Sequence, residues 1–352
     1  MKVIHIESGL GNQMLSYCEY LAMKKSNPED DCYIETIIYD IPECNEHICQ
    51  WNGYELRRIF NISAPNIKSI FSQEEWEIIM SEIYLSEFWK RDKHNWNYPV
   101  YFPKAFAKVG LQLKDIHNDF ESKEVKSKVL VPGTLKYWMH HTTLYGYLKY
   151  IKQKTRDNKY KDQLNFRDEL FIDSNENLFG GQKLLFRYRG SGIEDIAPEI
   201  RSSFIFPNIT DSKNKELMEL ICSCESVAIH IRRSDMLAAN EYCYKNGYFK
   251  RSVNFIRKHT SNPVFIVFCD PESVKWALEN YRILGLFPSK DKVIYVDWNK
   301  GNDSFRDMQL MSACKHQIIT NSSFGWWATW LNTNKSKITC CPDYRFNTTH
   351  TF

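Results

Sequence analysis

The sequence predicts an α/β protein built from two doubly wound parallel sheets. Its 352 residues exceed what one hydrophobic core usually holds, so we expect two domains of ordinary size. The chain opens with a strand, a glycine-containing turn and a helical pattern, which together begin a parallel βαβ unit. From about residue 214 onward, apolar strands alternate with helical patterns, as expected of a second such domain.

The N-terminal domain, predicted over 1–205, begins regularly and then loses its periodicity. Val3–Ile6 and Tyr33–Tyr39 read as strands, and the helical pattern between them runs through Met14 and Ala22. Residues of about 66–192 mix aromatic clusters with lysine-rich stretches, and the sequence does not place their elements. This middle region is the part of the chain whose role the sequence predicts least.

The C-terminal domain, predicted over 206–352, alternates strongly between the two periods. The expected strands are Val227–Ile231, Val264–Cys269, Val293–Val296 and Gln317–Thr320. The expected helices are centred on Leu217–Ile221, Phe249–Ile256, Val274–Asn280, Phe305–Met311 and Phe324–Leu331. In such a sheet, ligands bind at the carboxyl ends of the strands, so the residues that follow each strand are the candidates for a site.

Composition excludes several classes of function. The 46 Lys and Arg nearly balance the 43 Asp and Glu, which argues against a nucleic-acid partner. No run approaches the ~18 apolar residues of a membrane span. The first residues read as a strand and not as a signal peptide, so we expect a cytoplasmic location. The eleven cysteines lack the paired spacing of a zinc site and are expected to be free thiols.

Two arginines follow the first strand of the C-terminal domain. His230 lies in that strand, and Arg232, Arg233 and Asp235 come directly after it. Guanidinium groups match the oxygens of a diphosphate, and their charge stabilises a negative leaving group. A bare Arg-Arg pair is more often a solvated surface, but its place at a strand end favours a site.

A second strand end leads into a helix. Asn321, Ser322 and Ser323 precede or begin a helix at about Phe324, where free backbone N–H groups and hydroxyls form a phosphate cradle. Asp307, in the first turn of the preceding helix, is placed to accept hydrogen bonds from a guanine edge. Plain helix capping is the alternative for both segments.

The N-terminal turn and an absence complete the pattern. Gly9 and Gly11 allow close backbone approach to a ligand, and Asn12 is expected to project into the cleft, although a lone GxG is weak support. No Asp-x-Asp pair occurs, and the adjacent His140 and His141 give no ligand pattern, so we expect no metal and no other cofactor.

Three motifs together resemble glycosyltransferase family 11, the alpha-1,2-fucosyltransferases. They are Gly9-Leu10-Gly11-Asn12-Gln13-Met14, His230-Ile231-Arg232-Arg233-Ser234-Asp235 and Asn321-Ser322-Ser323-Phe324-Gly325-Trp326-Trp327. HxRRxD alone is shared with other fucosyltransferases, whereas this combination in this order is specific. Weaker similarity lies at 52–56, 195–201 and 311–316, so the resemblance covers most of the chain except about 66–192.

The resemblance implies a fold, a reaction and a set of roles. The fold is GT-B, in which two Rossmann-like domains face each other with the active site between them. The reaction is inverting, metal-free transfer of fucose from GDP-fucose to the 2-hydroxyl of a terminal galactose. The donor site implied is Arg232 on the diphosphate, His230 and Asp307 on guanine, and Ser322 and Ser323 on the phosphates. Asn12 would lie near the reacting centre. Arg233, Asn321, Phe324, Gly9 and Gly11 complete the predicted donor-binding set.

The proton acceptor and the acceptor site are less determined by the sequence. Asp235 is the best placed carboxylate for the catalytic base, with Glu241 and Glu7 as weaker candidates and a bracing role as the alternative. Trp138 and Tyr145 are predicted to stack on the galactoside, unless 66–192 is an independent insertion with its own core. Peripheral contact with a lipid-linked glycan and the oligomeric state are left open.

Two other functions compete with this prediction. HxRRxD does not fix the acceptor, so transfer to another hydroxyl or to a protein is one alternative. A degenerate relative that binds a glycan or nucleotide without turnover is the other. The presence of both arginines and of the complete Asn321–Phe324 segment argues against such decay.

Overall fold

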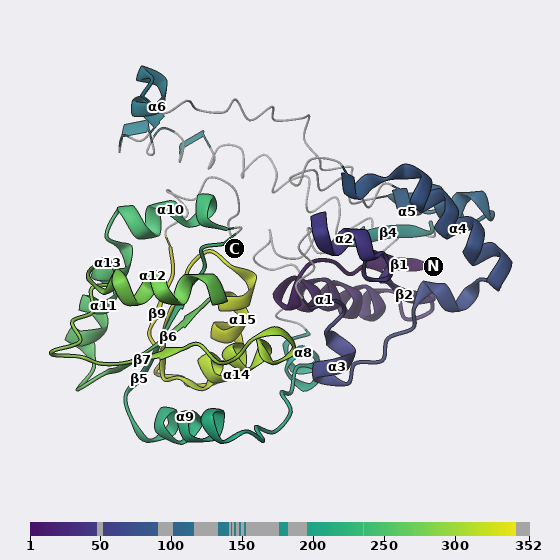
Figure 1. Ribbon diagram of the computed structural model, residues 1–352. Coiled ribbons are helices and arrows are strands. Elements are labelled where there is room, and N and C mark those ends of the chain that lie inside the picture. The colour runs from purple at the N-terminus through teal and green to yellow at the C-terminus, as the bar shows by residue number, and fades with distance from the viewer. Residues whose placement is uncertain are drawn as a thin grey trace. The chain divides into compact units, whose positions relative to one another are not determined.

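The computed structural model describes residues 1–47, 52–90, 101–115, 133–140, 142, 144–145, 148, 151–152, 176–181, 196–234 and 236–342 (Figure 1). The chain divides into two compact units. The first comprises 1–138 and 154–205, and the second comprises 139–153 and 206–352. Each unit contains a parallel sheet, which confirms the predicted α/β class with two parallel-sheet domains. The cleft expected between them stays a prediction.

The first sheet has four parallel strands in the order β2-β1-β4-β3. They are β1 (Lys2–His5), β2 (Cys32–Glu35), β3 (Lys114–Asp115) and β4 (Leu178–Gly181). The strand predicted over Tyr33–Tyr39 is too long, because Ile37–Asp40 forms the 3-10 helix η1. Ile37 and Ile38 are fully or almost fully buried there, so their apolar character serves a helical turn in the core and not a strand.

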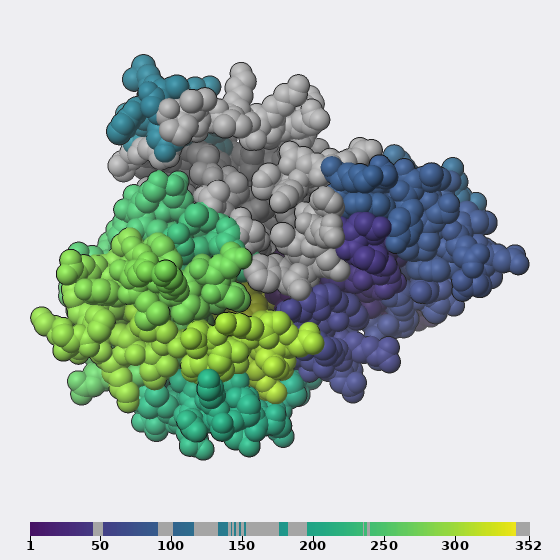
Figure 2. Space-filling view, viewed as in Figure 1, coloured from purple at the N-terminus to yellow at the C-terminus, as the bar shows by residue number. Residues whose placement is uncertain are grey.

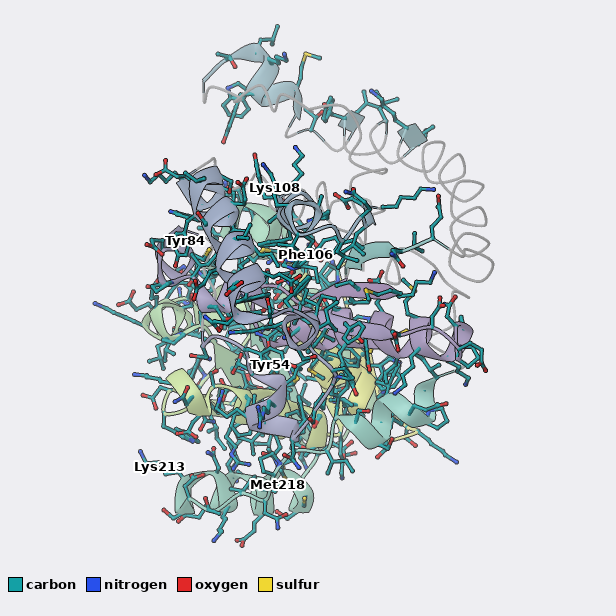
Figure 3. All side chains as sticks on the ribbon, turned by 90° about the vertical axis from the view of Figure 1, so that its right-hand side faces the viewer. Tyr54, Tyr84, Phe106, Lys108, Lys213 and Met218 are labelled. Atoms are coloured by element: carbon teal, nitrogen blue, oxygen red, sulfur yellow. The ribbon has the colours of Figure 1, made fainter. Side chains whose placement is uncertain are left out.

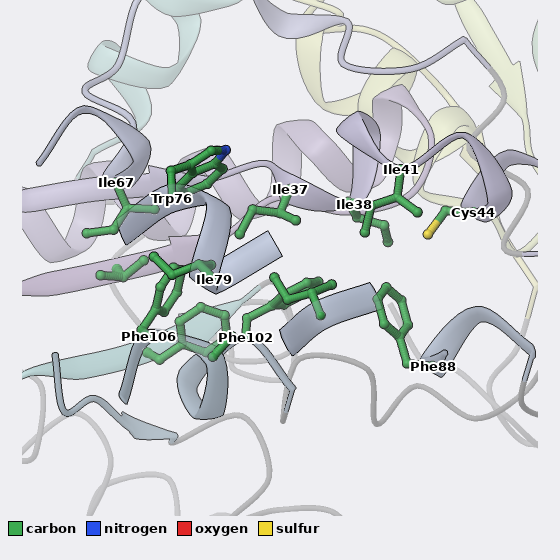
Figure 4. Packing of buried hydrophobic residues seen from close by; sticks show 14 of the residues in the cluster. Ile37, Ile38, Ile41, Cys44, Ile67, Trp76, Ile79, Phe88, Phe102 and Phe106 are labelled. Atoms are coloured by element: carbon green, nitrogen blue, oxygen red, sulfur yellow. The ribbon is translucent and has the colours of Figure 1, made fainter. Parts of the chain in front are cut away.

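Helices of the middle region pack into the core of the first unit. α4 (Gln73–Ser86) and α5 (Tyr101–Lys108) bury Ile79, Phe102 and Phe106 in one cluster with Val3 of β1 and Phe179 of β4 (Figure 4). Residues 73–108, where described, therefore share the core of the first sheet and are not a separate insertion.

The start of α4 and its outer face are fixed by polar contacts. The helix begins with a capping box: Ser72 Oγ accepts from the Glu75 N–H at 3.2 Å, and Glu75 Oε2 accepts from the Ser72 N–H at 2.8 Å. Lys108 Nζ of α5 lies 3.4 Å from Glu82 Oε2 of α4, on the side of the unit turned to the viewer in Figure 3. Besides η1, the other helices in the described residues of this unit are α1 (Leu10–Ser26), α2 (Pro42–His47), α3 (Leu56–Phe60), η2 (Ile67–Ile70), η3 (Phe88–Lys90), α6 (Leu135–His140, at the unit boundary) and α8 (Ala197–Ser203).

The second sheet has five parallel strands in the order β7-β6-β5-β8-β9. They are β5 (Ser226–Ile231), β6 (Val264–Cys269), β7 (Lys292–Val296), β8 (His316–Ile318) and β9 (Thr339–Cys340). The chain runs outward from β5 to β7, then returns to place β8 on the other side of β5. This reversal of strand order marks the point where doubly wound sheets bind ligands, outside the carboxyl ends of β5 and β8.

Helices cover both faces of the second sheet (Figure 1). On one face, α10 (Leu237–Lys245), α11 (Tyr248–His259), α12 (Val274–Glu279) and α13 (Tyr281–Leu284) contribute to a core with Val227, Ile229 and Phe265. Beyond the other face, α14 (Phe305–Ala313) and α15 (Ser323–Leu331) contact each other, and α9 (Ser212–Ser223) contacts α14. Side chains alternate along a strand, so His230 points to the face opposite Ile229.

Two short 3-10 helices, η6 (Pro271–Ser273) and η7 (Gly301–Asp303), follow β6 and β7. None of the ten cysteines in the described residues forms a disulfide. In the same part of the chain, no helix is long and apolar enough to cross a bilayer.

Candidate active site

The carboxyl ends of β5 and β8 bring two predicted segments together. Ile229 of β5 pairs with Ile318 of β8, so the residues that follow both strands leave the sheet at the same edge. The ring of His230 lies 5.8 Å from that of Phe324, centroid to centroid. A methyl group at Gly325 would lie only 2.6 Å from His230 Nδ1. The HxRRxD and NSSFGWW segments are therefore in direct contact, and the contact needs a glycine at 325.

His230 is a buried, neutral imidazole. It is 5% exposed, and its Nδ1 has no hydrogen-bond partner among the described residues. The pKa of His230 is lowered to about 4, mainly by burial; the Asp270 charge opposes this shift, and the Arg232 charge adds to it. A buried polar atom without a hydrogen-bond partner lowers the stability of the fold. Such atoms are typical of sites where a ligand supplies the missing partner.

Asp270 holds the segment that carries the two arginines. It directly follows β6, the neighbour of β5, and its Oδ1 lies 2.6 Å from Arg232 Nη1. Its Oδ2 accepts from the Arg233 backbone N–H at 2.7 Å and from Ser273 Oγ at 3.2 Å. Burial alone would raise the pKa of Asp270, but the charge of Arg232 and these hydrogen bonds hold it below its ordinary value. Asp270 is thus a carboxylate that orients Arg232.

The side chains of the two arginines lie in different surroundings. Arg232 is partly buried, with 17% of its side chain exposed beside Asp270. The guanidinium carbon of Arg233 lies 3.8 Å from the centre of the Trp276 ring and 5.1 Å from that of Tyr244. Arg233 therefore stacks on aromatic rings of α12 and α10. A contact of Arg233 with a donor stays a prediction.

Helix α10, which the sequence did not predict, fixes both loops of the site. Asn240 accepts from the Asn321 backbone N–H at 2.8 Å and donates to the Asn321 carbonyl at 3.2 Å. One turn later, Tyr244 donates to the Arg232 carbonyl at 2.8 Å. Asn240 is completely buried, so water does not compete for its two hydrogen bonds with Asn321. In the sequence, only the spacing of Asn240 and Tyr244 at i and i+4 indicated that both side chains lie on one face of a helix.

The start of α15 has the properties of an anion site. Ser322 is its N-cap residue, yet its side chain makes no capping hydrogen bond. Plain capping by Ser322, the alternative considered from the sequence, is therefore not what the structure contains. Asn321 is 6% exposed, and its Nδ2 has no partner among the described residues. Helix N-termini attract anions through their N–H groups and dipole, and here a buried amide donor adds to them.

Asp307 lies in the first turn of α14 within a polar network. Asn299 donates to Asp307 Oδ1 at 2.7 Å, and Asn214 in turn donates to Asn299 Oδ1 at 2.8 Å. Trp298 Nε1 donates to Asn214 Oδ1 at 2.7 Å. Burial raises the pKa of Asp307 to about 8, with the Asn299 hydrogen bond acting against the shift. Burial therefore favours the neutral acid form of Asp307 over a charged cap of the helix dipole.

The N-terminal turn is held by the motif residue Gln13. Its Nε2 donates to the carbonyls of Ser8 and Gly53, each at 2.8 Å, and its Oε1 accepts from the Glu55 N–H at 2.8 Å. Ser8, and not one of the two glycines, has the left-handed backbone, with φ of 60°. Gln13 explains why 52–56 accompanies the GLGNQM segment.

The two glycines and the asparagine of the turn fall around the start of α1. Gly9 caps the helix with φ of −77°, Gly11 is buried in its first turn, and Asn12 is partly buried. The close approach of Gly9 and Gly11 to a ligand, and the place of Asn12 near a reacting centre, stay predictions.

Asp235, the predicted base, lies outside the described residues. Of the two weaker candidates, Glu241 pairs with Lys245 on the exposed side of α10. Glu7 is buried, with its Oε2 4.0 Å from His5 Nε2 at the end of β1. Among the described residues, no three His, Cys, Asp or Glu side chains are grouped to hold a metal ion.

The two predicted acceptor-binding residues occupy the segment around α6. Trp138 is 67% exposed on α6, and Tyr145 is partly buried. Their stacking on a galactoside stays a prediction, as does metal-free transfer.

Comparison with known proteins identifies the region that holds this site. The family model of glycosyl transferase family 11 matches residues 201–348, which contain β5 to β9. Residues 201–348 are therefore similar to glycosyl transferase family 11. The family 11 resemblance predicted from the three motifs is confirmed over these residues.

Three curated relatives each match about a third of this chain. An alpha-1,2-colitosyltransferase of Escherichia coli is 35% identical over 133 residues, which are 36% of this chain and 43% of that protein. The O-antigen biosynthesis glycosyltransferase WbnK of Escherichia coli is 34% identical over 35% of this chain and 40% of its own length. Galactoside alpha-(1,2)-fucosyltransferase 1 of Mus musculus is 27% identical over 30% and 27%. The part of this chain that matches therefore spans less than half of each relative.

Solved structures with a similar course of the chain include two fucosyltransferases. NodZ alpha-1,6-fucosyltransferase soaked with GDP-fucose aligns with a TM-score of 0.42 and 13% identity, covering 94% of this chain and 91% of that one. POFUT1 in complex with GDP aligns with a TM-score of 0.35 and 12% identity, covering 97% and 98%.

The contact between Gly325 and His230 can be tested without a ligand. Gly325→Ala should force the imidazole or the start of α15 to shift, lowering the free energy of unfolding by about 2 kcal/mol as overpacked cores do. The displaced ring should gain solvent, and its pKa should rise from about 4 toward its ordinary value, as measured by NMR titration.

Gly285→Ala provides the control, because Gly285 has φ of +73° and its methyl group would lie 2.8 Å from Lys250 Cα, after α13. This variant should also lose stability but leave the titration of His230 unchanged. An unchanged His230 pKa in Gly325→Ala would contradict the packing described here.

Proposed function

We propose that this chain is an inverting alpha-1,2-fucosyltransferase that moves L-fucose from GDP-fucose to the 2-hydroxyl of a terminal galactose. The observation that carries the proposal is the contact of the His230–Arg232 and Asn321–Gly325 segments at the reversal of strand order in the region similar to family 11. The alpha-1,2 linkage is supported by the names of the relatives, which share it while differing in the sugar.

The diphosphate would bind between Arg232 and the first turn of α15. Asp270 orients the Arg232 guanidinium, and Asn240 fixes the backbone at Asn321. When the bond between the anomeric carbon and the β-phosphate oxygen breaks, negative charge grows on the diphosphate. The guanidinium and the helix N-terminus would stabilise that charge, which is why we propose that the reaction needs no metal.

The guanine base would be recognised by Asp307 and His230. Guanine offers two adjacent N–H donors, which favour a carboxylate over a neutral acid. Because Asp307 has a pKa of about 8 without a nucleotide, its partnership with guanine would release a proton near pH 7. Asn299 occupies one carboxyl oxygen and so fixes which oxygen faces the base.

The acceptor hydroxyl would attack the anomeric carbon opposite the departing GDP. Its proton would pass to a carboxylate, for which Asp235 remains our first choice, with Glu7 at the end of β1 as the alternative in the described residues. Asn12 would lie near the reacting centre, Gly9 and Gly11 would contact the donor, and Trp138 and Tyr145 would stack on the acceptor. Transfer to another hydroxyl remains the competing acceptor reading.

A second donor is favoured by one specific observation. The alpha-1,2-colitosyltransferase of Escherichia coli has 35% identity over 133 residues of this chain. Colitose lacks hydroxyls that fucose has, so discrimination depends on hydrogen bonds to the sugar and not on those to GDP. An assay must therefore offer both donors.

Transfer can be tested directly with purified protein. GDP-fucose and lactose should give a product with fucose in alpha-1,2 linkage, identified by mass and NMR, with undiminished turnover in EDTA. Arg232→Ala should reduce kcat by about a hundredfold or more, because the leaving group loses its charge-stabilising donor. If the protein transferred colitose and not fucose, the proposed donor would be wrong. If EDTA abolished the activity and magnesium restored it, the metal-free mechanism would be refuted.

The orienting role of Asp270 predicts a second result. Asp270→Asn removes the charge that holds Arg232 but keeps the size of the side chain, so GDP affinity should fall at least tenfold together with stability. Asp291→Asn is the matched control, because Asp291 lies 2.6 Å from Arg257 just before β7, at the opposite edge of the same sheet. It should lose stability and keep GDP affinity. Equal GDP affinity in Asp270→Asn and the parent would rule out this role.

A further inference from the structure

Six large apolar side chains are exposed on one short stretch of the chain. They come from α6 and the residues that follow it, and their exposed fractions lie between 46% and 79%. Side chains of α6 lie at the surface in the blue-teal part of Figure 2. They are Leu135, Trp138, Met139, Leu144, Leu148 and Ile151, which we call the apolar segment.

The spacing of these residues is that of helix faces that normally pack on something. Leu135, Trp138 and Met139 stand at i, i+3 and i+4 on α6. Leu144, Leu148 and Ile151 stand at i, i+4 and i+7, and the described residues here are helical. Such stripes are expected to face a core, yet all six side chains face solvent.

The same stretch concentrates positive charge. Residues 135–161 contain seven Lys and Arg and a single Asp, so their net charge of +6 is twice the +3 of the whole chain. Lys136, which follows Leu135 on α6, and Lys152, which follows Ile151, are exposed. The rest of the chain is consequently net negative, and this stretch is its basic part.

We propose that the apolar segment docks on an anionic lipid surface. Apolar stripes that include a tryptophan, flanked by lysines, are the composition of helices that lie in the membrane interface. Lysines near such a surface add attraction to anionic headgroups. A second copy of this chain fits less well, because it would bring two stretches of +6 together. The proposal stands on these side chains and does not require sugar transfer.

Vesicle flotation of the full chain tests the proposal. The chain should bind vesicles of phosphatidylcholine and phosphatidylglycerol, bind pure phosphatidylcholine at least tenfold more weakly, and detach in 0.5 M salt, as expected for attraction to anionic headgroups. Leu144→Glu with Leu148→Glu, and separately Lys136→Glu with Lys152→Glu, should each weaken binding at least tenfold.

Leu85→Glu is the matched control, because Leu85 is 75% exposed on α4, a helix that carries acidic residues. It should bind like the parent. Neither double variant should change the KM for soluble lactose, which separates this proposal from the proposed function and from stacking on the acceptor.

Four results would overturn the proposal. The first is that the parent does not bind anionic vesicles at low salt, and the second is that Leu85→Glu loses as much vesicle binding as the double variants. The third is that a double variant raises the KM for lactose and leaves vesicle binding unchanged. The fourth is that the parent forms a dimer and does not bind vesicles, and that Leu144→Glu with Leu148→Glu dissociates this dimer. The last result would assign the apolar segment to a second copy of the chain.

Discussion

The reversal of strand order at β5 is the constraint on which the site depends. Because β6 lies on one side of β5 and β8 on the other, the residues after β5 receive partners from both neighbours. From the β6 side, Asp270 orients Arg232. From the β8 side, the first turn of α15 packs against His230. A sheet with its strands in chain order would separate these two contacts. Both contacts therefore depend on the strand order of the sheet.

Much of this arrangement could be predicted from the sequence. The rest could not, and the reason is physical. The strand at 227–231 and the polar residues after it follow from local periodicity, so His230, Arg232 and Asn321 were found. Asp270 and Asn240 were missed because they act through partners 38 and 81 residues away in the chain. The helices at 73–108 were missed because aromatic residues obscured their stripes, although Ser72 and Glu75 spelled a capping box. Short-range patterns identify elements; partners distant in the sequence require the fold.

Residues of the family motifs serve packing as well as chemistry. Gly325 is fixed by the imidazole that lies against it, and Gln13 ties the N-terminal turn to 53–55 through two hydrogen bonds. Asp307 combines both roles, since the burial that packs it in the domain raises its pKa, against the effect of the Asn299 hydrogen bond that holds it. Membership of a motif therefore does not by itself make a residue catalytic. Each motif residue needs its own contact with substrate before a catalytic role is assigned to it.

The central claim is that a nucleoside diphosphate binds at the carboxyl ends of β5 and β8. A crystal structure of the chain with GDP tests it most directly. The account predicts the diphosphate within hydrogen-bond distance of Arg232 and of the backbone N–H groups that begin α15, with guanine against Asp307. A diphosphate bound instead at the Ser8–Gly11 turn of the first sheet, with Arg232 contacting only Asp270, would contradict it.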